Sequence, residues 1–314
     1  MKNKLFVGID TSNYTTSLGI VSEDGTLIAN LKRPLPVKAG ECGLRQSDAV
    51  FHHTVNIPYL VNEAKKYFSV GEISAVGVSS RPRNAEGSYM PCFLVGVSVA
   101  ESISSAMNVP LYRFSHQCGH IMAALYSSGC EDFAKAPFAA FHVSGGTTEL
   151  VRAEFSDGEF LTDIFGATAD LNAGQAIDRV GVMLGLGFPC GVEMEKLALE
   201  NTKKIPKKPI SIKDNGINLS GLENMAKKLY ADTEDKALTC AFVFEYIGRA
   251  ISALALEYEE KHGKSQFVFA GGVMSNTIVK GILAGDGRAF AEPDLSRDNA
   301  VGIALLARKK HLGH

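Results

Sequence analysis

Short apolar runs alternate with longer amphipathic stretches along most of this chain. Near the N-terminus, residues 4–9, 16–22 and 26–31 have the length and composition of strands, and the turns between them predict a meander. The elements expected next are, in order, a helix over 46–68, a strand over 73–79, a helix over 93–107 and a strand over 110–114. Strands that alternate with helices predict an α/β lobe.

The second part of the chain begins with a predicted helix over 116–126, for which the Ser115 hydroxyl is a plausible N-cap. The elements expected after it are, in order, a hairpin over 138–154, a helix over 170–184, a long helix over 232–262, a strand over 267–270 that runs into two glycines and a new helix, and a last helix from about 298. We therefore expect two lobes: residues 1–115, completed by the C-terminal helix at about 298–314, and residues 116–297.

Two turns have the same make-up, one in each predicted lobe. Residues 5–21 and 138–151 each contain an apolar run, a turn rich in glycine and hydroxyl side chains, and a second apolar run, which is typical of a β-hairpin. Small residues let backbone N–H groups approach an anion, and hydroxyls add donors. The pair predicts a phosphate-bearing ligand in a cleft between the lobes. For the first turn, the ordinary frequency of Ser and Thr in tight turns is an equally good explanation.

The composition of the chain limits the classes of partner that it could bind and indicates its cellular compartment. The 314 residues suffice for two domains, and the formal charge of −2 gives no global attraction to nucleic acid or to an anionic membrane. The six cysteines are scattered without a Cys-x-x-Cys pair, so neither a zinc knuckle nor a redox motif is indicated. We see no signal peptide and no apolar run that would span a bilayer, and we expect a cytoplasmic protein with reduced thiols and no membrane partner.

Two histidines have the spacing of metal ligands. His116 and His120 lie four residues apart, so on a helix both imidazoles share one face and can share a metal ion. Chance placement or a capping role is the alternative. Asp298 could supply a carboxylate, and two histidines with one carboxylate leave open positions, as in catalytic iron or zinc sites. Gln117 stands where zinc peptidases of the H-E-x-x-H type carry their general base.

Two further segments could bind a ligand. The strand at 267–270 ends in Gly-Gly before a helix, where Asn276 could hydrogen-bond a ribose or phosphate, although such a junction is also ordinary in α/β proteins. Asp170, Gly174 and Asp178 are expected on one face of a helix. A glycine inside a helix costs about 1 kcal/mol relative to alanine, and close approach of a ligand would explain Gly174.

In their order along nearly the whole chain, these motifs resemble the tRNA threonylcarbamoyladenosine synthase family, long labelled O-sialoglycoprotein endopeptidase. The matching segments are Gly8-Ile-Asp-Thr-Ser12, His116 with His120, Val143-Ser-Gly-Gly146, Ala173-Gly-Gln-Ala-Ile-Asp-Arg179, Leu184-Gly-Leu-Gly-Phe-Pro-Cys-Gly191, Leu219-Ser-Gly-Leu222, Gly271-Gly-Val-Met-Ser-Asn276 and Asp298-Asn299. Each segment alone is weakly specific, whereas the ordered set is highly specific.

The resemblance implies a two-lobed actin-like ATPase (ribonuclease-H-like) fold of the α/β class with a central cleft. It implies metal-assisted transfer of a threonylcarbamoyl group from threonylcarbamoyl-adenylate to adenosine in tRNA. The metal, one divalent iron or zinc ion, would bind His116, His120 and Asp298. Helper proteins of the same pathway would dock near 46–66. Candidate residues for the adenylate, or for an ATP-like nucleotide, are His142, Val143, Ser144, Gly145, Gly146, Asp178, Gly191 and Asn276, and Asp10 is the catalytic candidate.

The chain departs from the family where the reaction is expected. The replacements are Asn13-Tyr14-Thr15 for Cys-Asp-Glu, Cys118 for Glu, Thr147 for His, and Ser80-Arg-Pro-Arg-Asn84 for a Gly-Pro-Gly loop. Because these changes cluster around the expected reaction centre, we interpret the chain as a divergent paralogue. Two alternatives to the transferase follow: a paralogue with altered or no catalysis that binds a nucleotide in the cleft, and a metallopeptidase.

Overall fold

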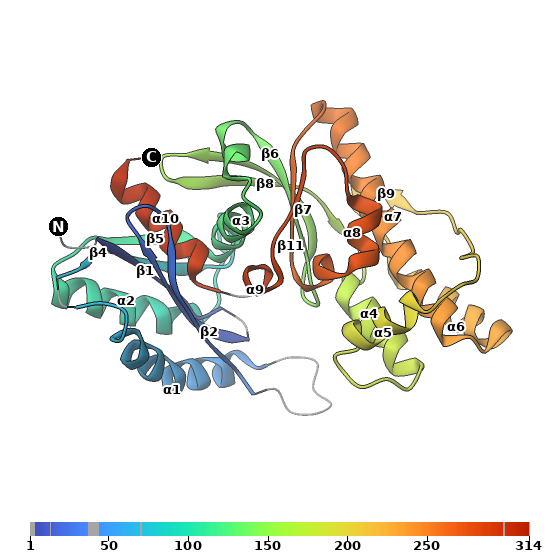
Figure 1. Cartoon of the computed structure of the whole chain (residues 1–314), viewed down its shortest axis with the longest axis horizontal. Helices are drawn as coiled ribbons and strands as arrows, with labels where there is room; N and C mark the ends of the chain where they lie inside the picture. Colours follow the sequence, from blue (N-terminus) through green and yellow to red (C-terminus); the bar gives the residue numbers. More distant parts are fainter. Residues whose placement is uncertain (1–3, 13, 37–43, 70, 298, 314) are drawn as a thin grey trace. The chain divides into compact units, whose positions relative to one another are not determined.

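The computed structural model describes residues 4–12, 14–36, 44–69, 71–297 and 299–313. Its contacts divide the chain into two compact units (Figure 1). The first unit contains residues 1–135, 154–161 and 297–314, and the second contains 136–153 and 162–296. The first unit thus extends past the boundary expected at 115, because the helix that follows it packs against the C-terminal helix.

The first unit contains a five-stranded sheet of order β3-β2-β1-β4-β5. Its strands are β1 (Leu5–Asp10), β2 (Thr15–Ser22), β3 (Leu27–Pro34), β4 (Ile73–Arg81) and β5 (Leu111–Ser115). The first three form the predicted antiparallel meander, whereas β4 pairs in parallel with both β1 and β5. The carboxyl ends of β1, β4 and β5 therefore lie at one edge of the sheet.

Helices cover both faces of this sheet (Figure 1). They are α1 (Gln46–Ala64) and α2 (Phe93–Met107) on one face and α3 (His116–Ser127) and α10 (Val301–Leu312) on the other, with a 3-10 turn, η1 (Glu131–Lys135). Gly19, Gly8 and Gly77 are paired across three adjacent strands and face α10. A Cβ at Gly8 would lie 2.3 Å from the Ala300 oxygen, so this row of glycines lets α10 lie directly on the sheet.

The second unit contains a seven-stranded sheet of order β12-β11-β6-β7-β8-β10-β9, except for the tip of the β7–β8 hairpin at 154–161, which belongs to the first unit. Its strands are β6 (Phe138–Val143), β7 (Thr148–Ser156), β8 (Glu159–Thr168), β9 (Ile212–Lys213), β10 (Gly216–Ile217), β11 (Phe267–Ala270) and β12 (Arg288–Phe290). The predicted hairpin is β6–β7, and β11 runs parallel to β6 with Ala270 opposite His142. The two turns that follow β6 and β11 therefore lie at the same edge.

The helices of the second unit are α4 (Ala173–Met183), α5 (Gly191–Leu199), α6 (Ser220–Thr233), α7 (Lys236–His262), α8 (Thr277–Leu283) and α9 (Pro293–Ser296), with the 3-10 turn η2 (Gly272–Ser275). Helices α4, α5, α6 and α8 pack against the long helix α7. In the part of the chain that the structure describes, α7 alone has the length and apolarity of a membrane span, but 72% of its apolar window is buried inside the protein. Burial of this kind is typical of a core helix.

Two helix boundaries differ from the sequence expectation. The helix expected from 170 begins at Ala173, because Asp170 accepts hydrogen bonds from the backbone of Leu219 (2.8 Å) and Ser220 (3.1 Å) at the start of α6. The helix expected from 232 begins at Lys236, and an unpredicted helix, α6, ends just before it at Thr233. Glu234 ends α6 in the left-handed conformation, and the Asp235 carboxylate caps α7. The expected helical face of Asp170, Gly174 and Asp178 is therefore wrong, since Asp170 precedes the helix.

Candidate functional site

The two predicted metal-binding histidines face each other in the first unit. His116 opens α3 directly after β5, and the Ser115 hydroxyl caps the helix as predicted, accepting from the Cys118 N–H. The Nε2 atoms of His116 and His120 lie 2.9 Å apart, and both side chains are buried. A Cβ at Gly302 of α10 would lie 1.9 Å from the Gly119 oxygen, so close backbone packing fixes α3 where it carries the imidazole pair.

A buried carboxylate holds the first of these histidines. Asp10, the last residue of β1, is 0% exposed, and its Oδ2 lies 2.7 Å from Nδ1 of His116. Burial alone would raise the pKa of Asp10. The charge of His116 and hydrogen bonds from His116, Ser12 and Ser79 outweigh it and hold that pKa well below its ordinary value. The catalytic role predicted for Asp10 does not fit this geometry, because the carboxylate is closed off from any substrate by its own partners.

The hydroxyls of the first predicted anion-binding turn are engaged by protein groups. The Thr11 hydroxyl donates to the Cys92 carbonyl (2.9 Å) and accepts from the Gly96 N–H (3.0 Å), so it lies within the first turn of α2. The Ser12 hydroxyl donates to Asp10. Both residues are 0% exposed. The Thr11 and Ser12 hydroxyls thus serve packing and do not act as the predicted anion donors.

The imidazole pair has the chemistry of a partial metal site. Metal–nitrogen bonds of about 2.0–2.1 Å at about 90–110° would separate two ligand nitrogens by about 2.9–3.4 Å, a range that includes the observed spacing. His116 also has the carboxylate partner on its other ring nitrogen that metal-bound histidines usually have. Asp298, the third predicted ligand, lies outside the described residues. Within those residues, no three His, Cys, Asp or Glu side chains gather in a metal-binding arrangement.

Two departures from the family converge on one backbone carbonyl. The Asn84 amide (2.9 Å) and the Cys118 thiol (3.2 Å) both donate to the Phe160 oxygen, at the tip of the β7–β8 hairpin. Arg81 in turn donates to the Asn84 side chain at 2.8 Å. Cys118 and Phe160 are both 0% exposed, and burial raises the pKa of the Cys118 thiol. Cys118 and the 80–84 loop thus form one hydrogen-bonded anchor for the hairpin tip within the first unit.

The predicted glycine turn of the second unit is open. Gly145 and Gly146 are exposed, and a Cβ built on either would have no atom within 4 Å. The Ser144 hydroxyl accepts from the N–H groups of Gly146 (3.3 Å) and Thr147 (3.2 Å) and so shapes the turn. Val143 is buried and His142 half-buried in the strand that leads into it. An exposed backbone between two strands is suited to an anion.

Gly174 serves this turn and not a ligand. A Cβ at Gly174 would lie 2.7 Å from the backbone of Gly145, and the Gly174 N–H donates to the Ser144 oxygen (3.1 Å). The neighbouring Ala173 N–H donates to the Thr148 hydroxyl (2.9 Å). Close packing of α4 against the turn therefore explains the glycine without a ligand.

The second Gly-Gly junction lies beside the same turn. Gly271 has φ +100°, and a Cβ there would lie 2.2 Å from the Val143 oxygen. The Ser296 hydroxyl binds both backbone groups of Gly271, at 2.8 and 3.0 Å. Asn276 is 5% exposed; its Oδ1 caps α8 by accepting from the Val279 N–H, while its Nδ2 has no hydrogen-bond partner among the residues that the structure describes. A buried donor without a partner is costly, and a bound ligand would satisfy it.

Asp178 of α4 lies close to the residue that precedes Gly191, the first residue of α5. The Asp178 carboxylate accepts from the Cys190 N–H (2.8 Å), immediately before Gly191 opens α5. Burial raises the pKa of Asp178, against the opposing effect of the Cys190 N–H. Helix α4, which carries Asp178, contacts both α5 and η2. The structure thus collects the 142–146, 178, 191 and 276 candidates in the second unit, whereas their roles as ligand contacts stay predictions.

Sequence reasoning missed two hydroxyl residues that build the two clusters. They are Ser79 in the first unit and Ser296 in the second. Ser79 ends a strand that the sequence did predict, so a polar residue at the carboxyl end of a buried strand was the available signal. Ser296 lies 25 residues from Gly271, its partner, and no local pattern connects the two.

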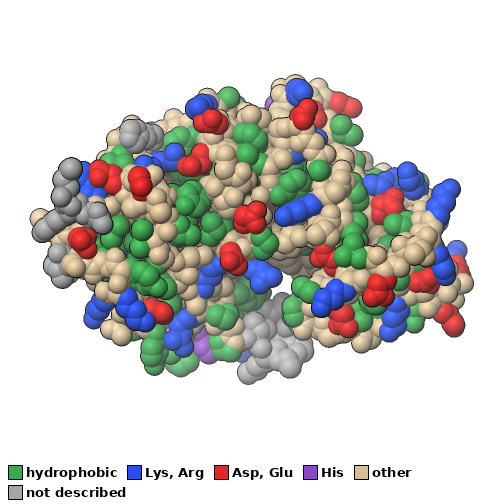
Figure 2. Space-filling model, in the orientation of Figure 1, with side chains coloured by type: hydrophobic (Ala, Val, Ile, Leu, Met, Phe, Trp, Pro, Cys, Tyr) green, Lys and Arg blue, Asp and Glu red, His purple; other side chains and the backbone are tan. Residues whose placement is uncertain are grey.

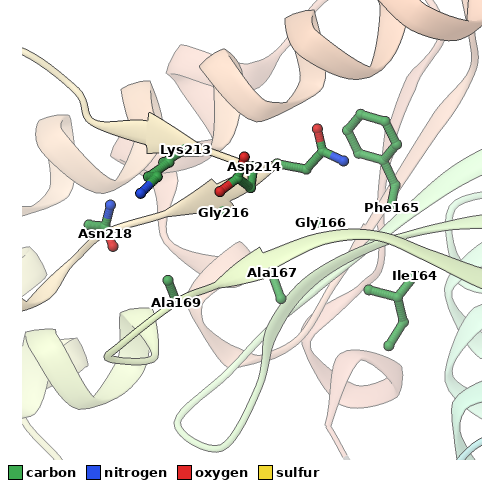
Figure 3. Close-up of a pocket in the computed structure, with 10 residues that line it drawn as sticks. Ile164, Phe165, Gly166, Ala167, Ala169, Lys213, Asp214, Gly216 and Asn218 are labelled. Atoms are coloured by element: carbon green, nitrogen blue, oxygen red, sulfur yellow. The ribbon is translucent and has the colours of Figure 1, made fainter.

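A separate surface pocket lies at the edge of the second sheet that β8, β10 and β9 form. It has a volume of about 460 Å³ and is lined by β8 and by the β9–β10 hairpin, including Phe165, Lys213 and Asn218 (Figure 3). None of the predicted site residues lines it. The pocket is therefore distinct from both clusters described above.

Similar folds occur in solved structures of the actin-like ATPase class, which confirms the predicted fold. HypF of T. kodakarensis aligns with a TM-score of 0.65 and 13% identity over 99% of this chain and 48% of that chain. Component A of the Acidaminococcus fermentans (R)-2-hydroxyglutaryl-CoA dehydratase aligns at 0.55 and 15%, over 99% and 100% of the two chains. A ROK family glucokinase from Streptomyces griseus aligns at 0.53 and 14%, over 97% and 99%. At these identities the likeness concerns the fold alone.

The sequence matches identify the family within this class. The family model for tRNA N6-adenosine threonylcarbamoyltransferase (TsaD) matches residues 39–305. The proteins of that name from Thermofilum pendens (29% identity over 95% of this chain and 86% of that protein) and Anaeromyxobacter sp. (30% over 95% and 92%) are similar over nearly their whole length. The chain belongs to the tRNA N6-adenosine threonylcarbamoyltransferase family, as the motifs predicted.

Proposed function

We propose that this protein transfers a threonylcarbamoyl group from threonylcarbamoyl-adenylate to the amine of an adenosine in tRNA. One observation carries the proposal: the family match spans 39–305, which includes every candidate site residue except Asp10. In the reaction, the amine nitrogen bonds to the carbamoyl carbon, the bond from that carbon to the phosphate oxygen breaks, and AMP and a proton leave. The matches do not favour a non-catalytic paralogue, and the family description names a transferase and not a peptidase.

The first unit contains the residues that we propose as metal ligands. His116 and His120 would hold one divalent iron or zinc ion through their facing Nε2 atoms. When bound, such an ion polarises a carbonyl as a Lewis acid. The protein orients the imidazoles through the Asp10 contact and keeps them buried, where few waters compete.

The second unit supplies the proposed adenylate contacts. The exposed backbone of Gly145 and Gly146 is suited to the phosphate, and such donors stabilise the charge that develops on a leaving phosphate. The Asn276 amide would donate its unpartnered Nδ2 hydrogen to the same ligand. Because the substrate arrives activated, positioning of the two reactants is the main remaining task.

The test is a transfer assay with the full chain, threonylcarbamoyl-adenylate, unmodified tRNA and the other pathway proteins, read by mass spectrometry of tRNA nucleosides. We expect modified adenosine with the wild-type chain and none with His120→Ala. The matched control is His262→Ala, which removes an exposed histidine at the end of α7. No product from the wild-type chain under these conditions would refute the proposed function.

Partner proteins of the same pathway belong to the proposal. Phe51, Val55 and Tyr59 of α1 are 63%, 45% and 58% exposed and recur every four residues, which makes an exposed apolar stripe, although Arg33 lies over the Tyr59 ring at 4.6 Å. A similar protein of Methanothermobacter thermautotrophicus, named a probable bifunctional tRNA threonylcarbamoyladenosine biosynthesis protein, is matched over 49% of its length. We propose that a helper protein covers this stripe. Tyr59→Asp should then weaken transfer in the complete assay and leave nucleotide binding unchanged.

We also propose how the tRNA binds and where in the cell the protein is located. On the face of each unit that Figure 2 shows, basic and acidic side chains are interspersed, in line with a net charge of −2. RNA would therefore bind through local contacts. None of the five cysteines that the structure describes forms a disulfide, which supports a cytoplasmic protein.

A further inference from the structure

Asp10 has an unusual number of partners for one carboxylate. Its Oδ1 accepts from the Ser12 N–H (2.7 Å) and the Ser12 hydroxyl (2.5 Å), and its Oδ2 accepts from the Ser79 hydroxyl and from Nδ1 of His116 (2.7 Å). A carboxylate offers about four lone-pair sites. Asp10 is therefore saturated as an acceptor, and at 0% exposure it reaches no solvent.

The sheet places these partners together. Asp10 ends β1, Ser79 lies near the end of the parallel strand β4, and His116 follows β5 directly. Three neighbouring carboxyl ends thus deliver the acid, one of its donors and the histidine to one edge of the sheet. Contact with the Phe93 ring, 6.3 Å between centroids, packs the His116 imidazole from the side.

The contact with Asp10 decides which nitrogen of His116 carries the proton. A carboxylate only accepts, so Nδ1 must donate, and once the imidazole is neutral, as metal binding requires, its Nε2 is unprotonated. That Nε2 lies 2.9 Å from Nε2 of His120 and 3.4 Å from the Ser12 hydroxyl. Metal ions bind the unprotonated nitrogen, and the partner of the other nitrogen fixes the ring.

We infer that Asp10 is a positioning residue that holds His116 in the Nδ1–H tautomer, with Nε2 directed at His120 and ready for a metal ion. The inference rests on the metal-binding part of the proposed function. It assigns to Asp10 a role that acts only through His116, and it explains why a charged side chain is enclosed at the end of β1.

Asp10→Asn tests the inference directly, because one of the donors to this side chain is a backbone N–H whose direction is fixed. The Ser12 backbone N–H must still find an acceptor, so the amide oxygen of the new side chain stays on the Ser12 side. The amide nitrogen then faces His116, whose Nδ1 must accept. The tautomer should reverse, and the proton should move to Nε2, the nitrogen that a metal ion needs.

The experiment measures zinc affinity and the ¹⁵N chemical shifts of His116 in the full chain. We expect the metal-free wild-type protein to show the Nδ1–H tautomer. Asp10→Asn should show the Nε2–H tautomer and bind zinc about 10- to 100-fold more weakly. Ser79→Ala, the matched control, removes another donor from the same carboxylate but keeps the His116 contact; its tautomer and zinc affinity should stay within about threefold of wild type.

Three results would overturn the inference: an Nε2–H tautomer in the metal-free wild-type protein, wild-type zinc affinity in a folded Asp10→Asn variant, or a wild-type chain that takes up neither zinc nor ferrous iron. The first needs no variant and decides the matter even if Asp10→Asn does not fold. A chain that binds zinc as expected but transfers no threonylcarbamoyl group would refute the proposed function and leave the role of Asp10 supported.

Discussion

The imidazole pair of the first unit and the glycine turn of the second are built in opposite ways. Asp10 and Ser12 are 0% exposed and bonded to each other, whereas Gly145 and Gly146 are exposed with open space around them. Side-chain ligands need burial and partners to hold one geometry, while a backbone site needs the absence of side chains. Glycine accordingly serves tight packing beside the imidazole pair, at Gly302, and an open surface at Gly145 and Gly146.

The largest expected effect on stability comes from a substitution in the closely packed region that carries the imidazole pair. Gly302→Ala places a Cβ 1.9 Å from the Gly119 backbone oxygen, a group that cannot move away without moving α3. We expect the free energy of unfolding to fall by about 3 kcal/mol. Gly145→Ala is the matched control in the open region, with an expected change below about 0.5 kcal/mol. Urea denaturation followed by circular dichroism measures both, and equal losses would contradict the contrast between the two regions.

A second variant tests the anchor around Cys118. Cys118→Glu restores the residue typical of the family, yet it sets a buried carboxylate against the Phe160 carbonyl, which needs a donor. We expect a loss of about 2 kcal/mol. Cys118→Ala, which removes only the weak thiol hydrogen bond and some packing, should cost about 1 kcal/mol. If Cys118→Glu stabilises the chain in the same urea experiment, the Cys118 hydrogen bond to the Phe160 carbonyl does not anchor the hairpin tip.

Asp170 sharpens the comparison because it also binds several donors but lies at the surface. It accepts from three backbone N–H groups, of Leu171, Leu219 and Ser220. Burial would raise the pKa of Asp170, but the hydrogen bond from the Ser220 side chain and the backbone bonds outweigh it, so the pKa is lowered. Asp170→Ala should cost about 1 kcal/mol near pH 7, as other lost helix caps do.

This contribution of Asp170 depends on pH in a definite direction. Because the folded-state pKa of Asp170 lies below the ordinary aspartate value of 3.8, the stabilisation is present above that value and is lost as the pH falls through the folded pKa. The difference in unfolding free energy between wild type and Asp170→Ala should therefore shrink between about pH 6 and about pH 3. A difference that stays constant over this range would contradict the assignment.

The sequence predicted local elements well and long-range partners poorly. The meander, the His116 helix and the hairpin at 138–154 depend on local periodicity and capping, and the structure contains them. The extra helix α6 and strand β8 were missed, as was the purpose of Gly174, which depends on a turn almost thirty residues earlier. Likewise, the sequence showed Asp10 as a reactive acid, because nothing near it in the chain reveals that Ser79 and His116 enclose it.

The smallest expected effect on stability belongs to Asn276 and separates capping from ligand binding. Its Oδ1 caps α8, while its buried Nδ2 has no partner. Asn276→Ser keeps an oxygen for the cap and removes the unpartnered donor, so the free energy of unfolding should change by less than about 0.5 kcal/mol. Loss of one ligand hydrogen bond should weaken AMP binding about three- to tenfold, measured by calorimetry.

Thr277→Ser, one residue along, keeps its hydroxyl bond to Glu195 and should leave AMP affinity unchanged. If Asn276→Ser binds AMP as tightly as wild type, the open edge of the second unit does not use this amide, and its unpartnered nitrogen has no role in the site.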